Sequence, residues 1–188
     1  MKKPLVLVAC GLGSLALTLG GCGSSSTTSS GGSGDSSKVG TSSAGKSKSD
    51  SGPSFKNGVL TTKDIRVKIT RHKVIPVGQK GNEYGDKPVI AFWYKTTNLS
   101  GKKTDPMTAF IINITAYQDN NPNAENEIDV AGLPDDKFLD SQSETIKKGG
   151  TVENAVAYEL DDLKTPVDLV ASDDLGMSQI GKVTYQVK

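Results

Sequence analysis

The stretch VIAFWYKTT, residues 89–97, decides the fold class. Its first six residues are apolar or aromatic, so a strand formed from them would be apolar on both faces, as the central strands of a sheet are. The polar run NLSGKK, residues 98–103, follows it as a turn signal. We therefore expect residues 89–97 to form a central strand.

Another strand is predicted just before this one. In IRVKIT, residues 65–70, Ile65, Val67 and Ile69 alternate with polar residues. A period of two is typical of a strand with one buried face and one wet face. This strand is expected to continue towards Val74 and to stop at Pro76.

Four further strands are predicted, over residues 109–118, 151–160, 167–171 and 181–188. In the first of them, alternate apolar side chains are expected to face the core: Phe110, Ile112, Ile114 and Ala116. Residues 133–146 are ambiguous, because a short helix, an irregular crossover and a strand fit them equally well.

Six or seven short strands with no long helix predict an all-β domain over residues 55–188. The expected architecture is an antiparallel immunoglobulin-like β-sandwich of about seven strands. The usual immunoglobulin disulfide cannot form, because the chain's two cysteines, Cys10 and Cys22, both precede the domain.

Three parts of the domain carry a family resemblance: residues 88–100, the strand ending in Tyr117-Gln118-Asp119, and residues 147–151. Together they resemble a family of uncharacterised lipoprotein domains of Gram-positive bacteria. That family is similar to the telokin-like, immunoprotective extracellular β-sandwiches. The resemblance implies a fold and transfers no catalytic residue.

The N-terminus has the pattern of a secretory signal peptide. Two lysines follow Met1, and residues 5–19 form an uncharged apolar run of about 15 residues, whereas a membrane span needs roughly 20. The small pair Gly20-Gly21 and then Cys22 resemble the lipobox of bacterial lipoproteins. The resemblance implies that residues 1–21 are removed and that Cys22 carries a diacylglycerol. The alternative is an ordinary secreted protein in which Cys22 keeps a free thiol.

Residues 22–54 are predicted to be the lipidated cysteine and a flexible tether. They consist mostly of Ser, Gly and Thr with scattered charges. Such a segment cannot bury enough apolar surface to offset the entropy of ordering it. The chain is therefore expected on the extracellular face of the cell membrane, anchored through Cys22.

No catalytic residue, cofactor site or metal site is predicted. In the loop 119–129, Asp119, Asn121 and Asn123 match the first ligands of a calcium loop, but Ala124 stands where the turn glycine belongs. An Asx-rich turn is the simpler interpretation. His72, the single histidine, is expected on the surface, and Trp93 in the core.

The charge of the domain is divided along the chain. Residues 55–103 carry 11 basic and 3 acidic residues, and residues 104–188 carry 6 basic and 16 acidic residues. Basic strands gathered on one sheet would form a face for an anionic wall polymer, lipid headgroups or an acidic partner. Alternatively, the two halves interleave and their charges cancel locally.

These observations favour a non-enzymatic, membrane-anchored interaction module that binds a protein or an envelope component. Nucleic acid is not an expected partner, and the oligomeric state is not determined by the sequence. The alternative function is a surface lipoprotein that binds a small ligand or calcium, with the loop 119–129 as its site.

Overall fold

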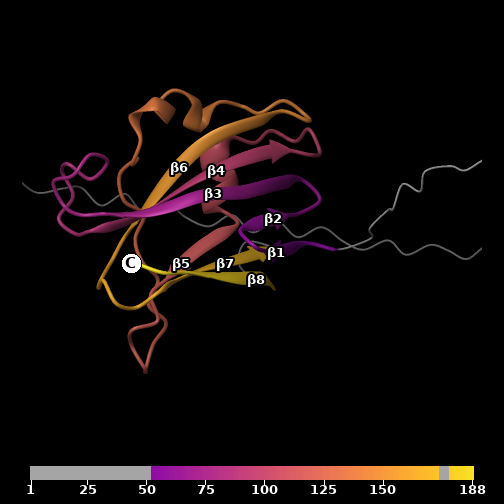
Figure 1. Cartoon of the computed structure of the whole chain (residues 1–188). Helices are drawn as coiled ribbons and strands as arrows, with labels where there is room; N and C mark the ends of the chain where they lie inside the picture. The colour runs from indigo at the N-terminus through magenta and orange to yellow at the C-terminus, as the bar shows by residue number, and fades with distance from the viewer. Residues whose placement is uncertain (1–51, 174–177) are drawn as a thin grey trace, which may run out of the picture. The chain divides into compact units, whose positions relative to one another are not determined.

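The computed structural model describes residues 52–173 and 178–188 (Figure 1). Cys22, the predicted signal peptide and nearly all of the predicted tether lie outside the described residues, so these remain predictions. The described residues all belong to one compact unit.

Within the described residues, eight strands form two antiparallel sheets (Figure 1). The larger sheet has the order β1-β2-β3-β4-β6, with bounds β1 Ser54–Lys56, β2 Val59–Thr61, β3 Ile65–Ile75, β4 Val89–Asn98 and β6 Thr151–Glu159. The smaller sheet has the order β5-β7-β8, with bounds β5 Ile114–Tyr117, β7 Val167–Asp173 and β8 Ser178–Tyr185. The predicted all-β antiparallel sandwich is confirmed, with eight strands in place of about seven.

The main core lies between the two sheets. β4 contributes Phe92 and Tyr94 to it, and β7 contributes Leu169 from the opposite sheet. A second, smaller core lies on the other face of the larger sheet, where Trp93 of β4 packs with Phe138. β4 is therefore buried on both faces between β3 and β6, as its sequence predicts.

The second core is covered by the segment that precedes β6. Two short 3-10 helices, η1 Asp136–Phe138 and η2 Ser141–Ser143, interrupt this segment, which includes the ambiguous residues 133–146. Ala131 and Leu133 pack with Phe138 against the sheet. An irregular crossover is thus the correct interpretation.

Residues 126–131 cover one edge of each sheet. Gln118 N–H donates to Asn126 C=O (2.9 Å) and Ile128 N–H donates to Ala116 C=O (3.0 Å) beside β5. Ala131 N–H then donates to Ala157 C=O beside β6 (2.8 Å). These bonds occupy edge groups that would otherwise be open to pairing with another chain.

The prediction of one strand over residues 109–118 is wrong in its first half. Residues Pro106–Ile111 form the helix α1, and only Ile114–Tyr117 are extended, as β5. The Asp105 carboxylate caps the helix by accepting from Thr108 N–H (2.7 Å), and Pro106 occupies its first turn. Ile112 follows the helix and is 51% exposed, so its predicted place in the core is also wrong.

Two short strands, β1 and β2, were not predicted. They form a hairpin around Asn57 (φ 52°) and Gly58 (φ 71°), the positive-φ pair of a type I′ turn. Phe55 and Leu60 point from the hairpin into the main core. Nearer the C-terminus, β8 starts at Ser178, earlier than predicted, and ends at Tyr185.

Candidate interaction surface

A β-bulge in β3 determines which side chains share the outer face of the larger sheet. Ile69 pairs with Tyr94, but Arg71 pairs with the next residue along, Trp93, so Thr70 is the extra residue. The Thr70 hydroxyl donates to Trp93 C=O at this point (2.9 Å). Strict alternation would place Arg71 on the same face as Ile65 and Val67, and the bulge reverses this.

Six cations consequently share the outer face of the larger sheet. We call this set the basic face: Lys56, Arg66, Lys68, Arg71, Lys73 and Lys95. All six are exposed. The predicted sharing of one wet face by Arg66 and Lys68 is confirmed, and Arg71 and Lys73 join them because of the bulge.

Three of these lysines lie in one row across the strands. Lys56 pairs with Val59, Val59 with Lys68, Lys68 with Lys95, and Lys95 with Glu153. Lys68 and Lys95 are therefore direct cross-strand neighbours of like charge, a destabilising arrangement.

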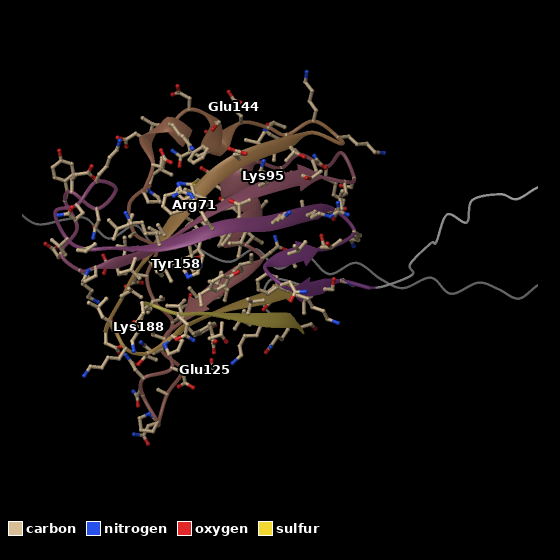
Figure 2. All side chains as sticks on the ribbon, in the orientation of Figure 1. Arg71, Lys95, Glu125, Glu144, Tyr158 and Lys188 are labelled. Atoms are coloured by element: carbon tan, nitrogen blue, oxygen red, sulfur yellow. The ribbon has the colours of Figure 1, made fainter. Side chains whose placement is uncertain are left out.

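Arg71 lies over an aromatic ring. Its guanidinium carbon is 3.5 Å from the centre of the Trp93 ring. The indole N–H donates to the Asp135 carboxylate (2.9 Å), which orients the ring. Burial favours the neutral form of Asp135, but the bond from Trp93 and the charge of Lys137 outweigh it and lower the pKa. Figure 2 shows Arg71 and Lys95 on the larger sheet, away from Lys188 and Glu125.

Within the described residues, only one member of the basic face has an ion pair, Lys95 with Glu153 (2.7 Å). The hydrogen bond from Lys95 lowers the pKa of the Glu153 carboxyl. Elsewhere the two halves of the chain do interleave, since Lys87 pairs with Asp161 (2.9 Å). Both charge hypotheses are thus correct in part: charges cancel at the end of the sandwich that carries Lys87, and cations gather on the outer face of β3.

The loop 119–126 forms a second candidate surface. Together with the outer face of the smaller sheet it encloses an open groove of about 620 Å³, lined by Tyr117, Asp168 and Lys182 among others. The Asp168 carboxylate accepts from Lys182 (2.7 Å) and from the Thr184 hydroxyl (2.6 Å). Burial opposes ionisation of Asp168, but these bonds lower its pKa overall.

The residues of the proposed calcium loop form an Asx turn in this structure. Asn121 Oδ1 accepts from the backbone N–H of Asn123 (2.9 Å). In the described part of the chain, no three His, Cys, Asp or Glu side chains lie close enough together to bind one metal ion. A calcium site here would therefore depend on amide and backbone oxygens.

The adjacent acids Asp161 and Asp162 and the single histidine, His72, belong to no cluster of metal-binding side chains in the described part of the chain. Asp161 and Asp162 form hydrogen bonds within the loops beside Gln118. His72 is exposed, as predicted, and its ring centre is 5.0 Å from that of Tyr185. Of the helices in the described ranges, none has the length and apolar character that a bilayer span requires.

Comparison with known proteins gives a family for this chain. A family model described as a domain of unknown function, DUF5067, matches residues 41–173, which is more than two thirds of the chain. The chain belongs to the DUF5067 family. No curated protein sequence matches it significantly.

One solved structure shares the fold of this DUF5067 domain. It is described as a "putative lipoprotein" from Staphylococcus aureus subsp. aureus NCTC 8325. The two chains are 21% identical, with a TM-score of 0.60, and the match covers 72% of this chain and 92% of the other. This match agrees with the predicted resemblance to lipoprotein domains of Gram-positive bacteria. The predicted similarity to telokin-like domains is not confirmed.

Sequence reasoning did not identify Arg71 and Lys73 as members of the basic face. The available signal was a break in alternation, because IRVKIT is followed by the polar run RHK before Val74 and Ile75 resume the apolar pattern. Such a break marks a bulge in some strands and a strand end in others. Only the pairing with β4 distinguishes them.

Proposed function

We propose that this DUF5067 chain is a cell-surface lipoprotein whose sandwich domain is a non-enzymatic interaction module. The basic face is its contact surface for an envelope component. The observation that carries this is the gathering of six exposed cations on one face, five of which have no ion pair within the described residues. Exposed positive charges without local partners attract anions and raise association rates.

The membrane anchor is supported by two independent observations. The sequence places a lipobox-like Leu19-Gly20-Gly21-Cys22 after a signal-peptide pattern. The Staphylococcus aureus protein that shares the fold is itself described as a "putative lipoprotein". Diacylglycerol on Cys22 would supply two acyl chains, enough for stable anchoring.

The anchor is tested with Cys22→Ser. We expect the variant to appear in the culture medium or to accumulate as an unprocessed precursor, because serine cannot form the thioether. Cell fractionation with mass measurement separates these forms. Cys10→Ser is the matched control, since it also removes a thiol within the N-terminal 22 residues, and it should remain in the membrane fraction. Membrane-bound Cys22→Ser protein of mature length would show that the anchor is not Cys22.

The contact surface is tested with Arg66→Glu combined with Lys68→Glu. Binding of this double variant to isolated cell envelopes should fall at least tenfold. The control, Lys164→Glu with Lys188→Glu, makes the same change in net charge at exposed lysines outside the basic face. Equal losses in the two variants would show that total charge, and not this face, governs binding.

A second candidate function rests on the groove beside the loop 119–126. Its polar lining, with the Asp168–Lys182 pair in its wall, suits a small polar ligand or, through Asp119 and the neighbouring amide oxygens, calcium. A rise in Tm with calcium that EDTA reverses, and that Asp119→Ala abolishes, would favour this function. An unchanged Tm in millimolar calcium would exclude the calcium version.

A further inference from the structure

We propose that the partner of the basic face is a linear polyanion, a polymer with negative charges repeated along its chain. This inference rests on the proposed function and specifies its partner. It follows from how the cations are spaced, from what lies between them, and from the stability that their arrangement costs.

The cations follow two directions on the sheet. Along β3, Arg66 and Lys68 lie about 7 Å apart, as do Arg71 and Lys73, since two residues of a strand advance by that distance; the bulge at Thr70 lies between the two pairs. Across the sheet, Lys68 and Lys95 lie on adjacent strands about 5 Å apart, and Lys56 lies two strands from Lys68 on the other side. A repeating polymer can contact several of these charges at once, and each contact adds to the affinity of the whole.

A compact anion fits this surface less well. The described residues form a groove beside each of three loops, 119–126, 81–87 and 102–104. No member of the basic face lines any of these three grooves. Small-molecule sites are concave and surround their ligand, whereas these cations stand on an open strand face.

A folded protein partner and a membrane surface also fit less well. Protein interfaces have an apolar, aromatic-rich centre, and membrane-binding faces insert large apolar side chains beside their lysines. In the described chain, the exposed large apolar side chains lie on loops and on α1, and none lies on β1, β2, β3 or β4. The one large aromatic ring of the basic face, Trp93, is buried beneath Arg71.

The arrangement lowers the stability of the free domain. Lys68 and Lys95 repel each other across the strands, and Glu153 neutralises only one of them. A bound polyanion would remove this repulsion, so its binding should raise the Tm.

Trp93 provides a built-in probe for the test. It is the single tryptophan of the chain, and its ring lies under Arg71. The full chain, in micelles of an uncharged detergent, is titrated with long-chain polyphosphate and separately with pyrophosphate while Trp93 fluorescence is recorded. We expect the long chain to bind at least 100-fold more tightly per molecule, with an affinity that falls steeply as salt is added.

Variants locate the binding on the surface. Arg66→Glu with Lys68→Glu should raise the Kd for polyphosphate at least tenfold and should reduce the magnitude of the log–log salt slope by about 1.4, the value for two lost contacts with a single-stranded polyanion. The control, Lys164→Glu with Lys188→Glu, should change the Kd less than threefold. Equal effects of the two variants would overturn the proposal.

Three other outcomes would overturn the inference. Pyrophosphate binding as tightly as the long chain would indicate a compact anion site. If phosphatidylglycerol added to the micelles saturated the Trp93 signal at a phosphate concentration equal to or lower than that of polyphosphate, the partner would be lipid headgroups. If neither probe binds, yet the Arg66/Lys68 variant still loses envelope binding, the basic face contacts an acidic protein. The proposed function would then stand and the polyanion would not.

Discussion

At the scale of single residues, Gln118 holds together the end of the sandwich beside the loop 119–126. Its side chain is fully buried, and its amide nitrogen donates to Asp162 C=O (3.0 Å) and Thr165 C=O (2.9 Å). Its amide oxygen accepts from Asp161 N–H (2.7 Å) and more weakly from Asp162 N–H (3.3 Å). One glutamine thus satisfies backbone groups of the loop that joins β6 to β7.

Gln118→Leu is expected to lower the free energy of unfolding by about 2–4 kcal/mol. The leucine fills a similar volume but leaves several backbone groups of residues 161–165 without a partner in a partly buried place. Urea unfolding measures the change. The exposed Gln186→Leu is the control and should change the free energy by less than about 0.5 kcal/mol. A similar small effect at position 118 would mean that water replaces the lost bonds.

Asp162, in the same loop, makes the stability of the fold depend on pH. Its carboxylate accepts from the backbone N–H groups of Thr165 (2.6 Å) and Lys164 (2.7 Å), and these bonds hold its pKa well below the usual range. Because the folded pKa is lower than the unfolded one, ionised Asp162 stabilises the fold above about pH 4, and this contribution is lost as the pH falls further.

Asp162→Asn should therefore lower the Tm at pH 7 and should have a smaller effect at pH 2, because the stabilisation by the ionised carboxylate decreases below about pH 4. Thermal melts from pH 7 to pH 2 test this. Asp86→Asn is the control, because Asp86 is exposed and makes no ion pair or hydrogen bond within the described chain. If the Tm difference for Asp162→Asn were the same at both pH values, the carboxylate charge would not be its cause.

At the scale of elements, β3 carries both the bulge and four of the six cations of the basic face. Its inner residues, Ile65 and Val67, are buried in the main core, and Ile75 reaches the second core on the opposite face. The bulge at Thr70 makes this possible, because odd-numbered residues face the main core before it and the opposite face of the sheet after it. One strand therefore contributes to two cores and to the candidate interaction surface.

Lys68→Gln is expected to raise the Tm by about 1–3 °C at low salt, because it removes the repulsion between Lys68 and Lys95. The gain should shrink at 1 M salt, where exposed charges are screened. Melts at the two salt concentrations measure it. Lys147→Gln removes an exposed lysine outside the basic face and should leave the Tm unchanged. A loss of stability in Lys68→Gln would show that its aliphatic stem packs usefully against the sheet.

At the scale of the whole molecule, the two cores lie on opposite faces of one sheet. Trp93, Ala155 and Ala157 pack under the crossover, while Phe92, Val156 and Tyr158 of the same strands pack between the sheets. Because β4 and β6 contribute to both cores, packing of the crossover and packing between the sheets are coupled through these two strands.

Phe138→Ala should reduce the free energy of unfolding by about 3 kcal/mol, since Phe138 is buried in the second core. Hydrogen exchange should accelerate most in residues 133–146 and less in β7 of the smaller sheet, which does not touch this core. Leu139→Ala, at a position 62% exposed, is the control. Equal acceleration in β7 and the crossover would show that the domain opens only as one unit.

The strands that could be predicted are those whose pattern is local. β3 and β4 were predicted to within about one residue, and β6 likewise, because alternation of apolar residues is visible within each strand. Residues 106–111 show the limit, since their helix depends on the Asp105 cap and Pro106, signals that compete with the apolar alternation after Ala109. The pair Asn57-Gly58 is a hairpin signal in the sequence. The strands on either side of it have only three residues each, too few to show a clear alternation.

The sequence by itself determined the fold class, the central place of β4, and the expectation of an exported, anchored chain, because periodicity, composition and terminal motifs are properties of neighbouring residues. Only the tertiary structure decided that Arg71 and Lys73 join Arg66 and Lys68, that Lys68 faces Lys95, and that the loop 119–126 borders a groove. These features depend on the register between strands far apart in the chain. A shift of one residue reverses every side chain beyond it, and no local pattern specifies that shift.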